Sequence, residues 1–147
     1  DPVKCYGKAR TVGYVERLNV PTHTEWIDRW KVFMPYANNI GTELNDDNQN
    51  TFVVAPKSIC TETFLIAGMD WDLDEASATN LSNYLRTRFA RFLLSMAKIS
   101  QHGTSKTYRF VPVQDFSRAW TDQDLYAKYE LTEEEITFIE SMIKPME

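Results

Sequence analysis

The stretch DEASATNLSNYLRTRFARFLLSMAKI, residues 74–99, carries the longest helical pattern in the chain. Asp72 or Asp74 can cap its N-terminus, and Asp74 and Glu75 suit the positive end of the helix dipole. Its apolar residues recur every three or four positions and so form one face of a helix: Leu81, Leu85, Phe89, Phe92, Met96 and Ile99. The pattern predicts one long helix over residues 74–99, packed through this face.

Strand-like and turn-like patterns surround this helix. Apolar, β-branched and aromatic runs predict strands and a hairpin before it, within residues 4–18, 31–37, 51–55 and 61–68. Residues 38–50 are polar and predict a loop, as do residues 100–106, whereas TYRFVPV (107–113) predicts a strand stopped by Pro112. Two short helices follow, opened by Thr121 or Asp122 and by Thr132 with Glu135 three residues on.

These elements predict an α+β fold, with a small mixed or antiparallel sheet packed against one long helix and two short C-terminal helices. The length, 147 residues, fits one domain. We divide it into a strand-rich part (1–73), the long helix (74–99), a loop and strand (100–116) and a helical tail (117–147). Because the chain begins at Asp1 without a methionine, we expect a domain cut from a longer chain.

The composition indicates a globular protein that makes no membrane contact. No apolar run approaches the roughly 20 residues of a membrane span, and no signal segment opens the chain. Cys5 and Cys60 form neither a metal-binding spacing nor a disulfide framework. We therefore expect a reduced, cytoplasmic protein.

The charge of the chain is distributed unevenly. The chain has 16 basic and 21 acidic residues, yet residues 76–114 contain six basic residues and no acidic one, while residues 115–147 contain three basic and nine acidic residues. A local positive field can attract a polyanion even when the total charge is negative. The alternative is that the six basic residues belong to an ordinary solvated face.

Motifs for several kinds of catalysis are missing from the sequence. It has no phosphate-binding glycine loop, no Gly-x-Ser-x-Gly elbow and no acid-x-Lys pair of the kind that metal-dependent nucleases use. His23 and His102 are isolated, and the carboxylates of DWDLDE (70–75) suit helix capping better than metal binding. We therefore expect no catalytic residue, metal site or cofactor in this fragment.

Several blocks occur in an order that resembles a known family: WKVFMPYANNIGT, SICTETFLIAG, NYLRTRFARFLLSMAKISQH, YRFVPVQDF and WTDQDLYAKYELTEEEITFIESMIKPM. Together, over about residues 12–146, they resemble the C-terminal region of bacterial adenine-specific restriction–modification DNA methyltransferases, including enzymes that fuse endonuclease and methylase. The resemblance implies a target-recognition domain that grips and reads double-stranded DNA. It also implies an upstream methyltransferase domain with the Asn-Pro-Pro-aromatic loop and the S-adenosylmethionine pocket, and this chain has no Asn-Pro.

The sequence departs from the family pattern at two positions. Glu130 stands where the family pattern has glycine, which suits a left-handed residue at a helix end. Ala90 stands where a second aromatic residue is common. Neither change bears on DNA contact.

The candidate DNA contacts lie in the loop after the helix and along a second stripe beside its apolar face, formed by Tyr84, Arg88, Arg91, Ser95 and Lys98. Arg88, Arg91 and Lys98 could neutralise phosphates, whereas Arg86 points away from that stripe and could pair with an acid instead. The loop offers groups that could read bases, and the full predicted set is Arg86, Arg88, Arg91, Lys98, Gln101, His102, Thr104, Ser105, Lys106 and Arg109.

Two other segments are weaker candidates. The hairpin carries Lys4, Lys8, Arg10 and Arg17 as a second possible phosphate-facing edge. The amides of residues 38–50 could reach adenine edges, but the acids beside them favour a solvated loop.

The sequence leaves two rival functions open. One is a protein-interaction or subunit-docking module of a restriction–modification complex, and the other is an independent nuclease, against which the missing acid-x-Lys pair speaks.

Overall fold

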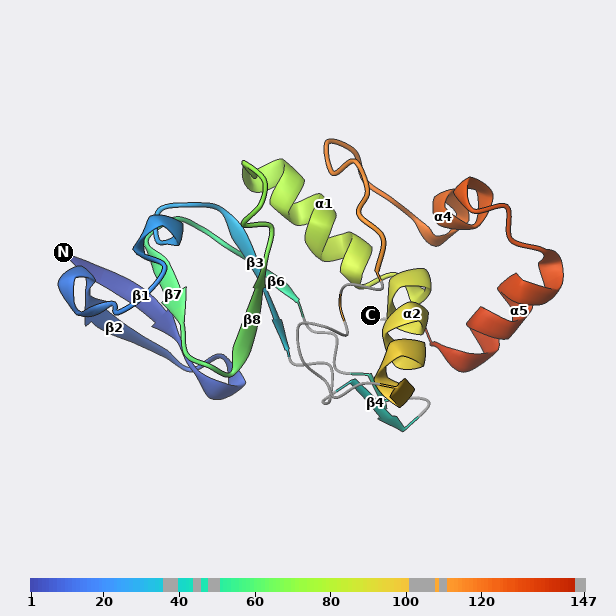
Figure 1. Cartoon of the computed structure of the whole chain (residues 1–147), viewed down its shortest axis with the longest axis horizontal. Coiled ribbons are helices and arrows are strands. Elements are labelled where there is room, and N and C mark those ends of the chain that lie inside the picture. Colours follow the sequence, from blue (N-terminus) through green and yellow to red (C-terminus); the bar gives the residue numbers. More distant parts are fainter. Residues whose placement is uncertain (36–39, 44–45, 48–50, 101–107, 109–110, 145–147) are drawn as a thin grey trace.

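A computed structural model describes residues 1–35, 40–43, 46–47, 51–100, 108 and 111–144, and the structural statements below concern these residues. Strands occupy one end of the elongated molecule and helices the other, with the first helix between them (Figure 1). The described residues form two three-stranded sheets, a two-stranded ribbon and four helices of seven or more residues. The predicted α+β class is confirmed, although the strands form two main sheets rather than one.

The first sheet is mixed and contains the predicted hairpin. Strand β1 (Pro2–Tyr6) pairs antiparallel with β2 (Val12–Glu16), from Pro2 opposite Glu16 to Tyr6 opposite Val12. A single 3₁₀ turn, η1 (Lys8–Arg10), joins them. Strand β7 (Ser58–Cys60) runs parallel to β1 on its other edge. The hairpin turn, with Lys8 and Arg10, therefore projects from one end of this sheet.

The second sheet is antiparallel, with β3 (Lys31–Pro35) between β6 (Phe52–Val54) and β8 (Phe64–Ala67). Aromatic rings join it to the first sheet. The Tyr6 ring lies 5.7 Å from that of Phe33 and 5.4 Å from that of Phe52, and Phe64 stacks on Phe33 at 5.8 Å. The strands predicted within residues 31–37, 51–55 and 61–68 are confirmed.

Lys31 is buried in β3, with 1% of its surface exposed. Its ammonium group donates hydrogen bonds to the carbonyls of Trp26, Ile27 and Arg29, at 3.1, 3.2 and 3.0 Å, in the turn that follows η3 (Thr24–Trp26). Burial lowers the pKa of Lys31 to about 8, because the charged form loses hydration. This lysine therefore ties a turn to the sheet.

Two short strands lie where the sequence predicted a loop. Strand β4 (Ile40–Glu43) pairs antiparallel with β5 (Asp46–Asp47), so the loop prediction is wrong for these residues. Main-chain hydrogen bonds do not require apolar side chains, and a polar segment can therefore pair without an alternating pattern. The amide residues of this segment lie outside the described part: Asn38, Asn39, Asn48, Gln49 and Asn50.

The predicted long helix is two helices, α1 (Glu75–Leu85) and α2 (Arg88–Ser100). Asp74 caps α1 as predicted, accepting a hydrogen bond from the Ser77 amide at 2.8 Å. The break falls at Thr87, whose hydroxyl donates to the Tyr84 carbonyl at 2.7 Å and accepts from the Ala90 amide at 3.1 Å. A threonine hydroxyl can replace main-chain partners in this way, ending one helix and starting the next.

The two tail helices form as predicted. Thr121 caps α4 (Asp122–Lys128), and Thr132 caps α5 (Glu133–Met142) in a capping box with Glu135. Between them Glu130 has φ 53°, so the left-handed position expected from the glycine of the family pattern is present with a glutamate in it.

The strand predicted over residues 107–113 is absent from the described part of that segment. Tyr108 is helical, Val111 lies in a bend, and residues 112–115 have no regular structure. The Val111 amide donates to the Tyr108 carbonyl at 3.0 Å, and the Pro112 carbonyl accepts from the Tyr84 hydroxyl at 2.7 Å. The Pro112 carbonyl therefore attaches the segment around Val111 to α1 through the Tyr84 hydroxyl.

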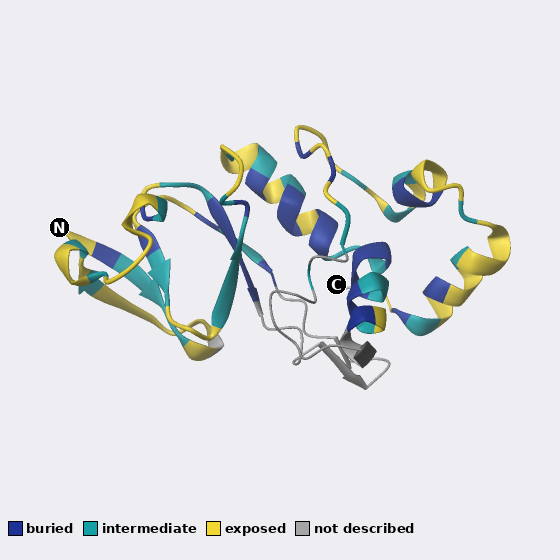
Figure 2. Cartoon of the chain, in the orientation of Figure 1, coloured by how far each residue is buried: buried dark blue, intermediate teal, exposed yellow. Residues whose placement is uncertain are grey.

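The main core lies between the second sheet and the helices, and its dark residues run along the inner faces of α1 and α2 (Figure 2). Among the aromatic side chains, Phe33 and Phe89 are buried and Trp26, Trp30 and Phe92 are half-buried. Phe138 differs from them, since 54% of it is exposed. Phe110 lies outside the described residues.

Candidate nucleic-acid interface

The start of α2 is organised by a carboxylate from the tail. Asp122 accepts hydrogen bonds from the Phe89 amide at 2.9 Å and the Arg88 amide at 3.3 Å. The first turn of α2 has no acidic residue of its own, so Asp122 supplies the negative charge that a helix N-terminus favours. This arrangement fixes α4 against α2, and the Arg88 and Phe89 amides are therefore already hydrogen-bonded within the protein.

Arg88 is paired rather than free along the helix. Its guanidinium lies 3.1 Å from the carboxylate of Glu140 in α5, and 22% of its side chain is exposed. A half-exposed pair of this kind contributes up to about 1 kcal/mol. Contact between Arg88 and a phosphate would have to displace Glu140.

Arg91 is buried, with 2% of its surface exposed. Its Nε donates to the carbonyls of Arg86 and Thr87, at 3.0 and 3.2 Å, and Nη2 donates to the carbonyl of Lys144 at 2.6 Å. The guanidinium thus serves the carbonyls at the end of α1, where a helix dipole favours a cation. The prediction that Arg91 lies on an exposed cationic stripe is wrong, because burial removes it from solvent.

Of the eight remaining predicted contacts, the structure describes the side chain of one, Arg86. Arg86 is half-buried, and its Nη1 lies 3.4 Å from the Thr51 carbonyl. The structure describes the backbone of Lys98 in α2 but not its side chain. The other six predicted residues lie outside the described part of the chain: Gln101, His102, Thr104, Ser105, Lys106 and Arg109. For these residues DNA contact stays a prediction.

The hairpin of β1 and β2 carries cations beside aromatic rings. Lys4 and Tyr14 face each other across the two strands, and the Lys4 ammonium lies 5.0 Å from the centre of the Tyr6 ring. A hydrogen bond to Tyr6, with the charges of Tyr6 and Tyr14, raises the pKa of Lys4 above its ordinary value. Tyr14 is 71% exposed. A cation and an exposed ring therefore share one face of the hairpin.

The hairpin turn adds two more cations. Arg10 is exposed, and its guanidinium stacks over the Phe52 ring at 4.1 Å, a contact that holds the side chain in place. Lys8 is exposed. Neither Lys4 nor Lys8 makes an ion pair with a carboxylate among the residues that the structure describes.

Arg17, the fourth cation of this segment, has a different role. Its Nε lies 2.8 Å from Asp1, and its Nη1 and Nη2 donate to the two oxygens of Asp28 at 2.7 and 3.0 Å. Lys57 also reaches Asp1, at 3.0 Å. These pairs neutralise Asp1 and Asp28, so Arg17 and Lys57 are engaged within the protein, whereas Lys4 and Lys8 remain the cations of this segment without an ion pair among the described residues.

The opposite end of the molecule is acidic. Helices α4 and α5 lie at the far end of the long axis from the hairpin (Figure 1), in the segment with nine acidic and three basic residues. Glu133 and Glu134 are exposed on α5 and make no ion pair within the described chain. The tail end therefore repels a polyanion.

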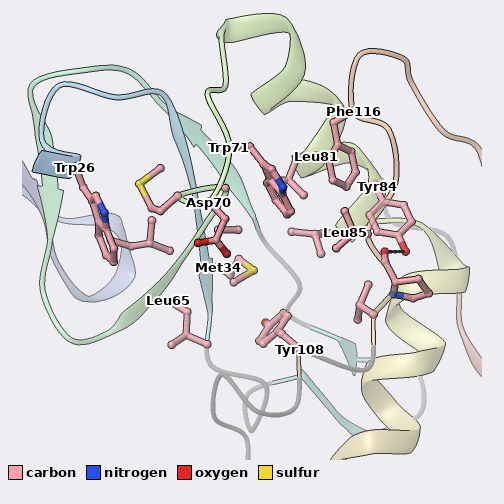
Figure 3. Close-up of a pocket in the computed structure, with 17 residues that line it drawn as sticks. Trp26, Met34, Leu65, Asp70, Trp71, Leu81, Tyr84, Leu85, Tyr108 and Phe116 are labelled. Atoms are coloured by element: carbon pink, nitrogen blue, oxygen red, sulfur yellow. Dashed lines mark hydrogen bonds between the residues drawn. The ribbon is translucent and has the colours of Figure 1, made fainter. Parts of the chain in front are cut away.

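A cavity of about 550 Å³ lies between the second sheet, α1 and the segment around Val111 (Figure 3). Its walls are mainly apolar and aromatic, and they include Trp26, Trp71 and Phe116. Asp70 is its only charged lining residue among those described. Among the described lining residues an anionic phosphate has no cationic partner, so the cavity does not add to the candidate interface.

Two further observations limit what the described residues can do. No three His, Cys, Asp or Glu residues among them lie close enough together to hold a metal ion. None of the helices described is long and apolar enough to cross a membrane.

Comparisons of this chain with protein-family models, with curated proteins and with solved structures gave no significant match. The candidate interface therefore rests on the residues and their geometry. The sequence ranked the hairpin cations below the helix as phosphate contacts. Spacing along the chain does not show which of the basic side chains are paired with carboxylates in the folded protein.

Proposed function

We propose that this chain is the target-recognition part of an adenine-specific restriction–modification DNA methyltransferase, and that it binds double-stranded DNA without performing chemistry. The ordered sequence blocks support the family. In this proposal the upstream domain of the parent enzyme supplies the S-adenosylmethionine and the catalytic loop, in the bacterial cytoplasm.

The observation that carries DNA binding is the cationic and aromatic hairpin. Lys8 lies in the turn between strands β1 and β2, and Lys4 lies opposite Tyr14 within the strands, while Asp1 and Asp28, at the open end of the hairpin, are held by Arg17 and Lys57. Ammonium and guanidinium groups bind phosphates without regard to sequence, and an exposed ring can contact sugars or bases. The hairpin therefore grips the backbone, and base reading falls to residues 101–109 as predicted from the sequence.

The test is a titration of the chain into a fluorescently labelled duplex of about 24 base pairs, followed by anisotropy at several salt concentrations. Each phosphate contact contributes roughly 0.9 to the slope of log affinity against log salt concentration. Replacing Lys4 and Lys8 by alanine together should lower the slope by about 1.8 and weaken binding. The Lys8→Ala variant alone, at an exposed position, should lower it by about 0.9 without disturbing the fold.

The matched control removes two cations from the acidic end, Arg118 and Lys144, both exposed. Their replacement by alanine should leave the slope and the affinity unchanged. Binding that ignores salt, or that weakens equally in the control, would show that the hairpin is not the DNA-binding surface.

A further inference from the structure

An apolar groove of about 360 Å³ lies between α2 and α5, remote from the hairpin. Its floor consists of Phe89, Phe92, Leu93, Leu131, Phe138 and Ile139. The Phe138 ring meets that of Phe92 edge-on at 5.8 Å, yet 54% of Phe138 remains exposed. Met96, one turn of α2 beyond Phe92, is 38% exposed. Exposed apolar side chains beside a groove mark a surface at which another molecule can bury them.

The rim of the groove is acidic. Glu134 and Glu135 line it, and Glu133 precedes them on α5. Glu135 is engaged with the Thr132 amide at 2.8 Å, but Glu133 and Glu134 have no partner in the described part of the chain. Arg88, at the start of α2, is held by Glu140. Unpaired negative charge at the edge of an apolar floor favours a partner that is apolar on one face and basic at its borders.

We propose that this groove docks one amphipathic, basic helix of another protein or domain. A third helix fits between two helices because its side chains fill the furrow between them, as in other helix-in-groove complexes. Helix α2 has 13 residues and so spans roughly 20 Å, which a partner helix of three to four turns matches. The proposal is independent of DNA binding, which uses the other end of the molecule.

A second copy of this chain is a poor occupant. Groove-to-groove pairing about a two-fold axis would place Glu133 and Glu134 of one copy against those of the other. Nucleic acid and anionic lipid are disfavoured by the same charges. Self-association of the chain is nevertheless one outcome of the experiment.

The probe is a synthetic 14-residue helical peptide whose leucines form one face and whose lysines flank it, labelled with fluorescein. Two comparison peptides have the lysines replaced by glutamates, or the same residues in an order that gives no apolar face. Anisotropy should show the amphipathic basic peptide binding at least tenfold more tightly than either. Equal binding of the reordered peptide would show general charge attraction and overturn the proposal.

Variants locate the binding site on the chain. Phe138→Ser should weaken binding at least tenfold, whereas Leu18→Ser, at an apolar residue that is 97% exposed at the other end, should not change it. The double variant Glu133→Gln, Glu134→Gln alters only exposed groups and should reduce the salt dependence of binding. Unchanged binding in both the Phe138→Ser and the double variant, or self-association of the chain that Phe138→Ser abolishes, would refute the assignment.

Discussion

Replacing Glu130 by glycine should stabilise the protein. The chain leaves α4 through two main-chain hydrogen bonds, from the Leu131 amide to the Tyr126 carbonyl at 3.0 Å and from the Glu130 amide to the Ala127 carbonyl at 3.2 Å. This pattern is a Schellman motif, and it requires the left-handed conformation that Glu130 adopts, with φ 53°. A residue with a Cβ atom is strained in this conformation, by about 1 kcal/mol relative to glycine.

The charge of Glu130 adds a smaller effect. A carboxylate at a helix C-terminus opposes the dipole at a cost of about 0.3 kcal/mol or somewhat more on an exposed surface. Glu130→Gly should therefore raise the free energy of unfolding by about 1.3 kcal/mol, which corresponds to roughly 3–5 °C in melting temperature for a chain of this size. Glu130→Ala removes the charge but keeps the Cβ atom, and it should gain only the smaller amount.

Urea denaturation followed by circular dichroism measures these differences, with the m-value expected to stay constant. Ala127→Gly, at an exposed helical position in α4, is the opposite control and should cost about 1 kcal/mol. Equal stabilisation by alanine and glycine at position 130 would refute the strain argument and leave only the charge. No gain from glycine would refute both.

Three further predictions concern the buried and capping groups. Asp122→Ala should lower the free energy of unfolding by about 1–2 kcal/mol, because two amides of α2 lose their acceptor, and thermal denaturation would show it. Arg91→Ala should lower the free energy of unfolding by roughly 3 kcal/mol or more, because Arg91 is buried. Arg88→Ala should lower it by at most about 1 kcal/mol, because Arg88 is partly exposed. Urea denaturation of the two variants measures the difference. The pKa of Lys31, about 8, lies below its ordinary 10.5, so the folded protein binds fewer protons than the unfolded one between these values. The free energy of unfolding should therefore rise between about pH 8 and 10.5, by up to about 3 kcal/mol more than that of the Lys31→Met variant. Denaturation curves of both proteins across this pH range measure the difference. An identical pH profile for the two proteins would show that Lys31 is not the group responsible.

Local signals in the sequence predicted those parts of the fold that local interactions determine. The capping box at Thr132 and the caps at Asp74 and Thr121, each of the latter two being one of two candidates in the sequence, depend on residues within a few positions of one another. Five of the six strands of the two main sheets also follow from short apolar and aromatic runs, whereas β7 lies in a segment between two predicted strands where no strand was predicted.

The sequence failed where long-range contacts decide. The apolar spacing continues across residues 85–89, so it could not show that Thr87 and the distant Asp122 divide the helix. The stripe of Arg88 and Arg91 was predicted from position alone, but Glu140 and the Lys144 carbonyl, both far along the chain, determine whether each guanidinium reaches solvent. Phe138 is an aromatic residue of the kind found in cores, yet it lies at the surface because it lines the groove between α2 and α5.

The capping of α2 by Asp122 has a consequence for the order of folding. Its two hydrogen bonds join residues 33 and 34 positions apart, so closing that loop costs entropy before the contact is gained. Helix α1 carries its own cap and can form early against the second sheet. The first turn of α2 is capped only after Asp122 of the tail has reached it. We therefore expect hydrogen–deuterium exchange during refolding to protect α1 first and the first turn of α2 only together with α4.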